Sequence, residues 1–185
     1  MRVFVDEAVV TRGSVSTSIT NGAFTSDVTS WTDNDEAGAT SAWVTGGYLG
    51  LTGNGTAAAI REQQLSVSGG DQNTQHALDI VVERGPVTLK VGSTSGAEDY
   101  IAEATLLTGV HSLSFTPTGA NVFVEFSSNL ERQVLVDSVA IASSGAMELA
   151  APWAEADLYN LRIVTGKLNK HISTSWCKAQ RMNTR

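Results

Sequence analysis

Short stretches in which apolar and polar residues alternate, separated by turn residues, run through most of this chain. In NVFVEF, residues 121–126, Phe123 and Glu125 fall between three other apolar residues. QHALDIVVER, VTLKV, VHSLSFTP and RQVLVDSVAIA have the same period of two. Since successive side chains of a β-strand point to opposite faces, this period predicts half-buried strands. We count roughly nine or ten of them between residues 15 and 142.

Turn signals separate these stretches at intervals of about ten residues. They include Gly46-Gly47, Gly69-Gly70-Asp71 and the segment from Pro117 to Gly119, and the whole chain has 17 Gly. This spacing is typical of an antiparallel sandwich or jelly roll and not of alternating strands and helices. We therefore predict an all-β fold, an antiparallel β-sandwich of jelly-roll type over residues 15–143.

Two segments flank the predicted sandwich. RVFVDEAVV, within residues 1–14, predicts a lead-in strand or hairpin. Residues 144–185 are expected to form a linker, a short helix and an irregular basic tail. The helix is predicted at about 153–163, because Pro152 suits its start and PWAEADLYNLRI has one apolar stripe.

The charge is unevenly distributed along the chain. Residues 162–185 hold six of the 12 Lys and Arg and none of the 19 Asp and Glu. An acidic body repels phosphate backbones, so nucleic-acid binding by the main domain is not expected. No stretch is long and apolar enough for a membrane span. Cys177 is the only cysteine, so no disulfide can form within the chain.

Two large aromatic residues follow an early turn signal. Asn21-Gly22 favours a turn, because both residues tolerate positive φ. Phe24 and Trp31 come just after it and are costly to leave in water. We interpret the two rings as a plug at one end of the sandwich, in preference to a ligand platform.

Three other aromatic residues are candidates for stacking on sugar rings. They are Trp43, Tyr48 and Tyr100. Tyr48 and Leu49 are adjacent in sequence, so their side chains are expected to point to opposite faces of the strand. The alternative is that these are ordinary partly exposed aromatic residues, which β domains commonly carry.

The sequence predicts no enzyme. GSTSG at 92–96 has Thr94 where a nucleophilic serine would stand, and neither a zinc-protease motif nor a phosphate-binding loop is present. His76 and His111 share faces with apolar residues, so we interpret them as hydrogen-bonded histidines at the edge of the core.

The segment DNDE, residues 33–36, places several carboxylates in one loop. Asp33 and Asp35 are therefore candidate calcium ligands, although the segment lacks the spacing of an EF-hand loop. The alternative is a solvated acidic loop. We therefore expect no cofactor, and structural calcium is the one exception that should be tested.

Several motifs in residues 15–143 resemble the galactose-binding-like jelly rolls, which include many carbohydrate-binding modules. The motifs are Asn21-Gly22-x-Phe24, Trp31-Thr32, YLGLTG at 48–53 and LVDSVAIAS at 135–143. The resemblance implies the same sandwich fold and a glycan-binding role.

Asp137 lies within the last of these motifs. Strict alternation turns it toward the core with Leu135 and Val139, where a lone carboxylate is costly. In the resembling modules the equivalent Asp often helps to hold a structural calcium ion, which makes Asp137 a third candidate ligand. Thr25 stands where those modules often have Glu. The alternatives are a β-bulge and a carboxylate that caps the Asn21-Gly22 turn.

A second resemblance covers nearly the whole chain, to a domain of tail or virion structural proteins of tailed bacteriophages. It rests on RVFVDEAVVTR, VTLKVGSTSG, DYIAEATLLTGVHSLSFTPTG and PWAEADLYNLR, whereas residues 165–185 depart from that pattern. It implies a non-enzymatic structural domain in the virion tail, assembled in the host cytoplasm. Its expected partners are other virion or tail proteins, with surface glycans as a further partner. The alternative function is a carbohydrate-binding module that uses exposed aromatic residues.

Overall fold

Every secondary-structure element in the described part of the chain is a β-strand. The computed structural model describes residues 9–11, 15–143 and 148–150. Ten strands lie within residues 15–143: β2 (Thr32–Asp33), β3 (Thr40–Val44), β4 (Tyr48–Thr52), β5 (Ala59–Ser66), β6 (His76–Arg84), β7 (Val87–Gly92), β8 (Ile101–Leu106), β9 (Gly109–Phe115), β10 (Asn121–Ser128) and β11 (Val134–Ser143).

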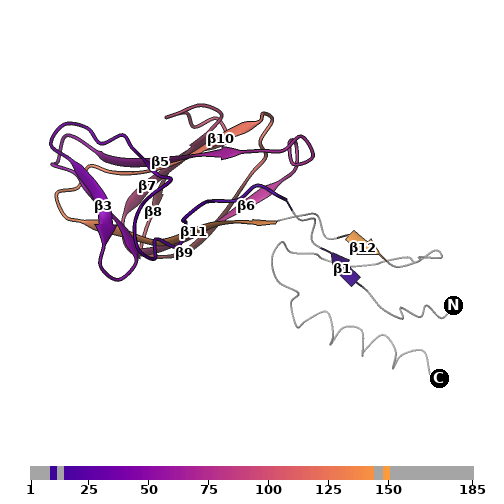
Figure 1. Ribbon diagram of the computed structural model, residues 1–185, viewed down its shortest axis with the longest axis horizontal. Helices are drawn as coiled ribbons and strands as arrows, with labels where there is room; N and C mark the ends of the chain where they lie inside the picture. The colour runs from indigo at the N-terminus through magenta and orange to yellow at the C-terminus, as the bar shows by residue number, and fades with distance from the viewer. Residues whose placement is uncertain (1–8, 12–14, 144–147, 151–185) are drawn as a thin grey trace, which may run out of the picture. The chain divides into compact units, whose positions relative to one another are not determined.

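These ten strands form two antiparallel five-stranded sheets. Sheet I has the order β2-β5-β10-β7-β8, and sheet II has the order β3-β4-β11-β6-β9. Figure 1 shows them as two layers, with β5 and β10 in one and β6, β9 and β11 in the other. The predicted antiparallel sandwich is confirmed. The chain changes sheet repeatedly between β4 and β11, so each hydrophobic face is built from segments far apart in sequence.

The core lies between the two sheets. On β10 the side chains of Val122, Val124 and Phe126 are fully buried, as their alternation predicts. From sheet II, the side chains of Leu78 and Ile80 on β6 are likewise fully buried in this core. The burial of such apolar side chains contributes roughly 1.5–3 kcal/mol each relative to exposure, before the cost in conformational entropy.

The predicted aromatic plug is present. Phe24 is completely buried and Trp31 is 3% exposed. Their ring centroids are 5.5 Å apart, and the Trp31 ring lies 5.8 Å from that of Phe126. The indole N–H of Trp31 donates a hydrogen bond of 3.3 Å to the carbonyl of Asn21. The early segment therefore closes one part of the core.

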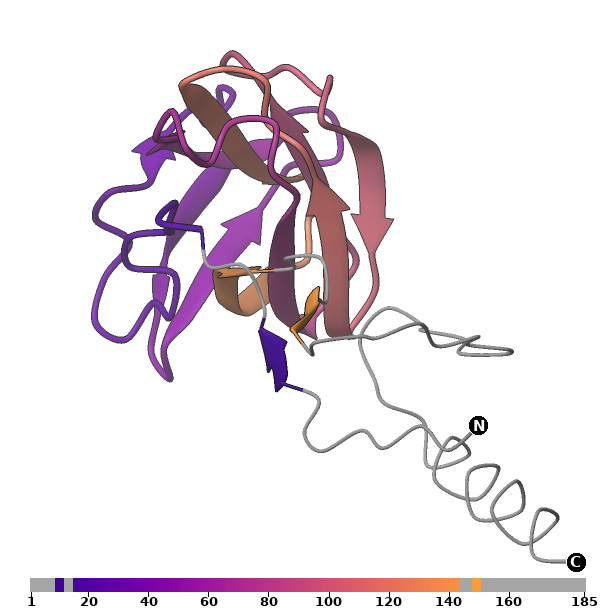
Figure 2. The same cartoon turned by 90° about the vertical axis from the view of Figure 1, so that its right-hand side faces the viewer.

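Two polar side chains on the inner face of β5 hold the early segment in place. Gln63 accepts from the amide of Thr20 and donates to its carbonyl, at 2.8 Å in both bonds. Arg61 donates to the carbonyl of Trp31 and to the side chain and carbonyl of Ser41 on β3. The guanidinium therefore joins sheet I to sheet II. In Figure 2 the early segments, drawn in indigo and purple, occupy one side of the sandwich.

The segments outside the sandwich are described only in part. Of the predicted lead-in strand, the described portion is β1 (Val9–Thr11), which forms a two-stranded sheet with β12 (Glu148–Ala150). The expected linker thus contains a strand. The helix predicted at about 153–163 and the basic tail lie outside the described residues. No helix long and apolar enough to cross a membrane is found among the residues that are described.

Candidate functional site

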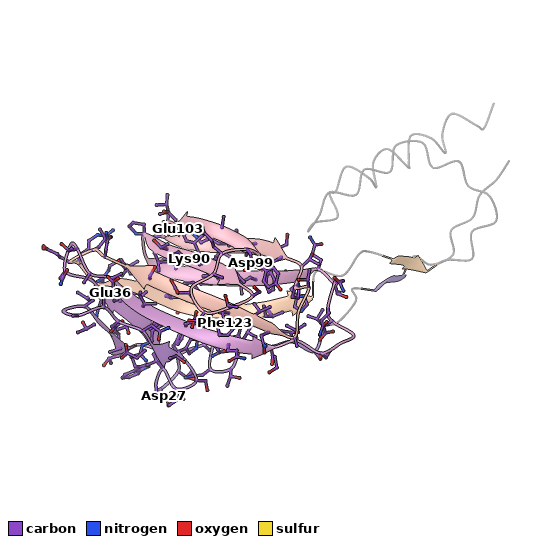
Figure 3. The ribbon with its side chains drawn as sticks, turned by 90° about the horizontal axis from the view of Figure 1, so that it is seen from above. Asp27, Glu36, Lys90, Asp99, Glu103 and Phe123 are labelled. Carbon is purple, nitrogen blue, oxygen red and sulfur yellow. The ribbon has the colours of Figure 1, made fainter. Side chains whose placement is uncertain are left out.

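The outer face of sheet I, which points away from the core, is the candidate site. The alternation on β10 turns Phe123 and Glu125 outward. The register places Glu62 of β5 and Lys90 of β7 directly opposite Glu125. Lys90 forms an ion pair of 3.3 Å with Glu103 of β8. Four adjacent strands thus bring three carboxylates, one ammonium group and one aromatic ring onto a single face. Figure 3 labels Lys90, Glu103 and Phe123 on this face.

Glu62 anchors a loop over this face. Its carboxylate accepts from the hydroxyl of Ser95 at 2.7 Å and from the amide of Gly96 at 2.9 Å, and it is 4% exposed. The loop also lies close to Gly92, where an added Cβ would stand 2.3 Å from the carbonyl oxygen of Ala97. Glu62 is therefore committed to holding the loop and has little capacity left for a ligand.

Of the three carboxylates that the structure describes on this face, Glu125 is the one that makes no hydrogen bond or ion pair. It is 8% exposed, and within the described ranges no hydrogen bond or ion pair reaches its carboxylate. Burial raises the pKa of Glu125, the charge of Lys90 opposes that rise, and the negative charges of Glu62 and Glu103 add to it. A buried carboxylate without a partner is costly, so such a residue is a candidate for function.

The carboxylate of Glu125 retains access to solvent. Wherever the structure describes a fully buried polar side-chain atom, that atom has a hydrogen-bond partner. The oxygen atoms of Glu125 have none, so they are not fully enclosed. They can therefore accept hydrogen bonds from a ligand that lies on the sheet.

Phe123 supplies an apolar contact beside this carboxylate. It lies two residues from Glu125 on the same strand face, a separation of about 7 Å along β10. Its ring is only half buried, and the residue opposite it on β7 is Gly92, over which the backbone of Ala97 lies. A face that combines one aromatic ring with a few fixed polar groups suits a polar ligand that has apolar faces of its own.

The histidines are held by hydrogen bonds, as the sequence predicted. His76 is fully buried, with Nδ1 2.8 Å from the carbonyl oxygen of Thr74 and Nε2 3.0 Å from the hydroxyl of Thr17. Nε2 of His111 lies 2.6 Å from the carbonyl oxygen of Leu107. Both imidazoles have structural partners.

The three aromatic residues predicted for sugar stacking do not form one platform. Trp43 pairs with Leu49 on the core side of the β3–β4 hairpin, and its indole N–H donates to the carbonyl of Phe24 at 2.7 Å. Tyr48 pairs with Val44 on the other side of the same hairpin. Tyr100 lies just before β8, on the other sheet, so no two of these rings share a surface.

Tyr100 is also engaged in the structure itself. Its ring is stacked at 6.3 Å from that of Phe115, and its hydroxyl accepts from the amide of Thr118 at 3.2 Å. These contacts give the ring a role in holding the loop before β10.

The candidate calcium ligands have other partners in the structure. Asp33 forms an ion pair of 2.9 Å with Arg61. Asp35 accepts from the amides of Ser41 and Ile60, so it connects β3 to β5. Over the described ranges, no group of three or more His, Cys, Asp or Glu side chains is placed to hold a metal ion.

The predicted orientation of Asp137 is wrong. Register shifts interrupt the pairing of β11 with β6 on both sides of Val136, and Asp137 has no partner in the register. Val134, Val136 and Val139 consequently face the core, while Asp137 is half buried. This is the β-bulge that the sequence left open as an alternative, and an extra residue in one strand shifts every side chain beyond it.

The sequence already indicated which side chains point to the outer face of sheet I. The alternation in NVFVEF already separates Phe123 and Glu125 from the core residues, and that in VTLKV separates Lys90. What the sequence does not reveal is that β5, β10, β7 and β8 are neighbours in this order. Strand pairing across long sequence separations decides which outward residues meet.

The comparisons with known proteins concern the fold. No protein-family model matches the chain, and no curated protein sequence matches it. The enzymatically active domain of tailspike protein 4 of bacteriophage CBA120 superposes with a TM-score of 0.51 and 14% identity, over 66% of this chain and 21% of that one. BiXyn10A CBM1 in its apo form superposes with a TM-score of 0.51 and 18% identity, over 70% of this chain and 98% of that one.

A third solved structure, TmCBM61 in complex with β-1,4-galactotriose, has a TM-score of 0.46 and 12% identity. It covers 68% of this chain and 97% of that one. At such identities a match concerns architecture alone, and the two matches at 0.51 support the predicted jelly-roll sandwich.

Proposed function

We propose that this chain is a non-catalytic glycan-binding module and that the outer face of sheet I is its binding surface. The observation that carries the proposal is the pair formed by Glu125 and Phe123. Glu125 is a buried carboxylate that accepts no hydrogen bond and forms no direct ion pair with any described residue, and Phe123 is a half-buried ring on the same strand face. A sugar ring offers hydroxyl donors at its rim and an apolar face, so it can satisfy both at once. The carbohydrate-binding modules among the structures of similar fold are consistent with this role.

The experiment compares the two outer faces of the sandwich. The full chain is screened on a glycan array, and the ligands found are titrated by calorimetry against Phe123→Ala. The matched control is Tyr48→Ala, which removes an aromatic ring from the outer face of sheet II. We expect Phe123→Ala to weaken binding by about tenfold or more and Tyr48→Ala to leave it unchanged. Chromatography of the bound glycan should show no cleavage.

Two results would contradict the proposal. One is the absence of binding to any glycan of the array by a folded wild-type chain. The other is loss of binding in Tyr48→Ala with full binding in Phe123→Ala, which would move the site to sheet II.

A second candidate function is a structural domain of a phage tail, located in the virion and packed against other tail proteins. The match to the CBA120 tailspike domain favours it, together with the resemblance of RVFVDEAVVTR and PWAEADLYNLR to tail proteins. The two functions are compatible, because a tail domain can also bind surface glycans. A gene neighbourhood made of tail genes would support this candidate, and one made of polysaccharide-degrading enzymes would contradict it.

A further inference from the structure

On the outer face of sheet I, negative charges outnumber positive ones, and not every carboxylate is paired with a cation. Around Glu125, the described outward side chains of the four strands include three carboxylates, those of Glu62, Glu103 and Glu125 itself. The one ammonium group among them belongs to Lys90. Lys90 is bound to Glu103 and not to Glu125. Glu62 is occupied by Ser95 and the loop that follows it. The carboxylate of Glu125 thus feels the charge of the neighbouring Lys90, but within the described ranges it has no direct ion pair and no hydrogen-bond donor.

A ligand can supply what the protein does not. The Coulomb attraction between two charges strengthens as water is excluded, so a cation placed against the nine-tenths-buried Glu125 gains more than it would at an open surface. Charge-assisted hydrogen bonds are also about twice as strong as neutral ones. Phe123, two residues away on the same face, offers its ring to the apolar face of the sugar that carries the cation.

We propose, building on the glycan-binding function above, that this face selects glycans that carry a protonated amine over neutral and anionic glycans, with the carboxylate of Glu125 as the acceptor of the ammonium group. The ligand class is therefore de-N-acetylated amino sugars. A uronic or sulfated sugar would add its own negative charge next to those of Glu62 and Glu125, so we expect it to be repelled. An N-acetylated sugar keeps the hydroxyl groups but lacks the charge.

The test uses sugars that differ in one group. Glucosamine oligomers and N-acetylglucosamine oligomers of equal length are titrated by calorimetry against the full chain, together with a neutral glucan and a uronic acid oligomer. The pH is slightly below neutral, so that the amine is protonated. We expect the glucosamine oligomer to bind at least about tenfold more tightly than its N-acetylated counterpart, with a preference that declines as salt is added.

The variant E125Q isolates the charge. It should remove most of the preference for the amine, whereas Asp79→Asn, which removes a carboxylate from the outer face of sheet II, should preserve it. Burial raises the pKa of Glu125, so its ionised form costs stability near neutral pH and E125Q should fold at least as well as the wild type. Thermal unfolding of E125Q provides this check.

The outcomes separate this inference from the proposed function. Equal binding of amine and N-acetylated oligomers, or a preference unchanged in E125Q, overturns the inference and leaves glycan binding in place. Binding of a tri-lysine peptide as tight as that of the amine oligomer also overturns it, because the face would then select charge without the sugar. A wild-type chain that binds none of the sugars and no array glycan contradicts both.

Discussion

At the scale of single residues, the Asn21-Gly22 turn explains why two aromatic rings are fixed so early in the chain. Asn21 adopts a φ of 50°, and its side-chain amide donates to the carbonyl and carboxylate of Asp27 and to the carbonyl of Thr29. Gly22 accepts from the amide of Val139 on β11 at 2.8 Å. The turn thus connects the first covering segment to the last strand of the sandwich.

We predict that Gly22→Ala is strongly destabilising. An added Cβ would lie 2.1 Å from the carbonyl oxygen of Val139, a backbone atom that cannot move without displacing β11. We expect a loss of about 2–3 kcal/mol in the free energy of unfolding, measured by denaturant titration. Gly69→Ala is the control, because nothing lies within 4 Å of its added Cβ, and it should change stability by less than about 1 kcal/mol. Equal effects of both substitutions would contradict the close approach at Gly22.

At the scale of elements, one carboxylate joins the start of the described sandwich to the loop between β5 and β6. Oδ2 of Asp71 accepts from the amides and the hydroxyls of Ser16 and Thr17. Hydrogen bonds from Ser16 are the main cause that lowers the pKa of Asp71 to about 2. Thr17 also contacts the buried His76, so a single cluster holds this end of the molecule.

The Asp71 cluster predicts a specific acid dependence. A carboxylate with a lowered pKa in the folded state stabilises the fold above its unfolded pKa, and that contribution is lost as the pH falls through the folded value. For Asp71 the window runs from the ordinary value of 3.8 down to about 2. We expect Asp71→Asn to be less stable than the wild type at neutral pH, with a difference that shrinks across this window in denaturant titrations.

The same substitution at the exposed Asp79 is the control for Asp71. It should change stability little at either end of the pH window, because Asp79 points to solvent between Ser112 and Ala140. A difference between wild type and Asp71→Asn that stays constant with pH would show that the charge of Asp71 is not what holds the two segments together.

At the scale of the whole molecule, the sandwich has one buried interior and two outer faces of different character. The described residues of the hydrophobic core all lie between Phe24 and Val139. Their burial is shared between the two sheets and the early covering segment. The ligand-binding surface that we propose lies on one outer face only. The stability of the fold and the binding of a ligand therefore depend on opposite sides of the same strands.

We predict that a fragment of residues 15–143 folds by itself. It contains all of the described core, so its unfolding should be cooperative, with a midpoint within a few degrees of that of the full chain, as measured by circular dichroism. A fragment of residues 34–143 lacks Phe24 and Trp31 and should not fold. An unfolded 15–143 fragment would show that residues outside this range are required for stability.

Much of this fold follows from the sequence, because burial has the same period as the strand. The alternation in NVFVEF and QHALDIVVER predicted both the strands and their buried faces, and Asn-Gly followed by two aromatic residues predicted the plug. Trp43 illustrates what the sequence alone does not reveal. Its place on the core side of the hairpin depends on its pairing with Leu49 and on the carbonyl of Phe24, neither of which a local pattern reveals.

The strands, the turns and the side chains that point away from the interior could all be predicted from the pattern of residues, because alternation is a local property of the backbone. The pattern does not reveal which strands are neighbours or where the bulge at Asp137 shifts β11. Nor does it reveal that Glu125 lies between Glu62 and Lys90 without a hydrogen bond to any described residue. Strand order and register depend instead on packing between segments that are distant in the chain.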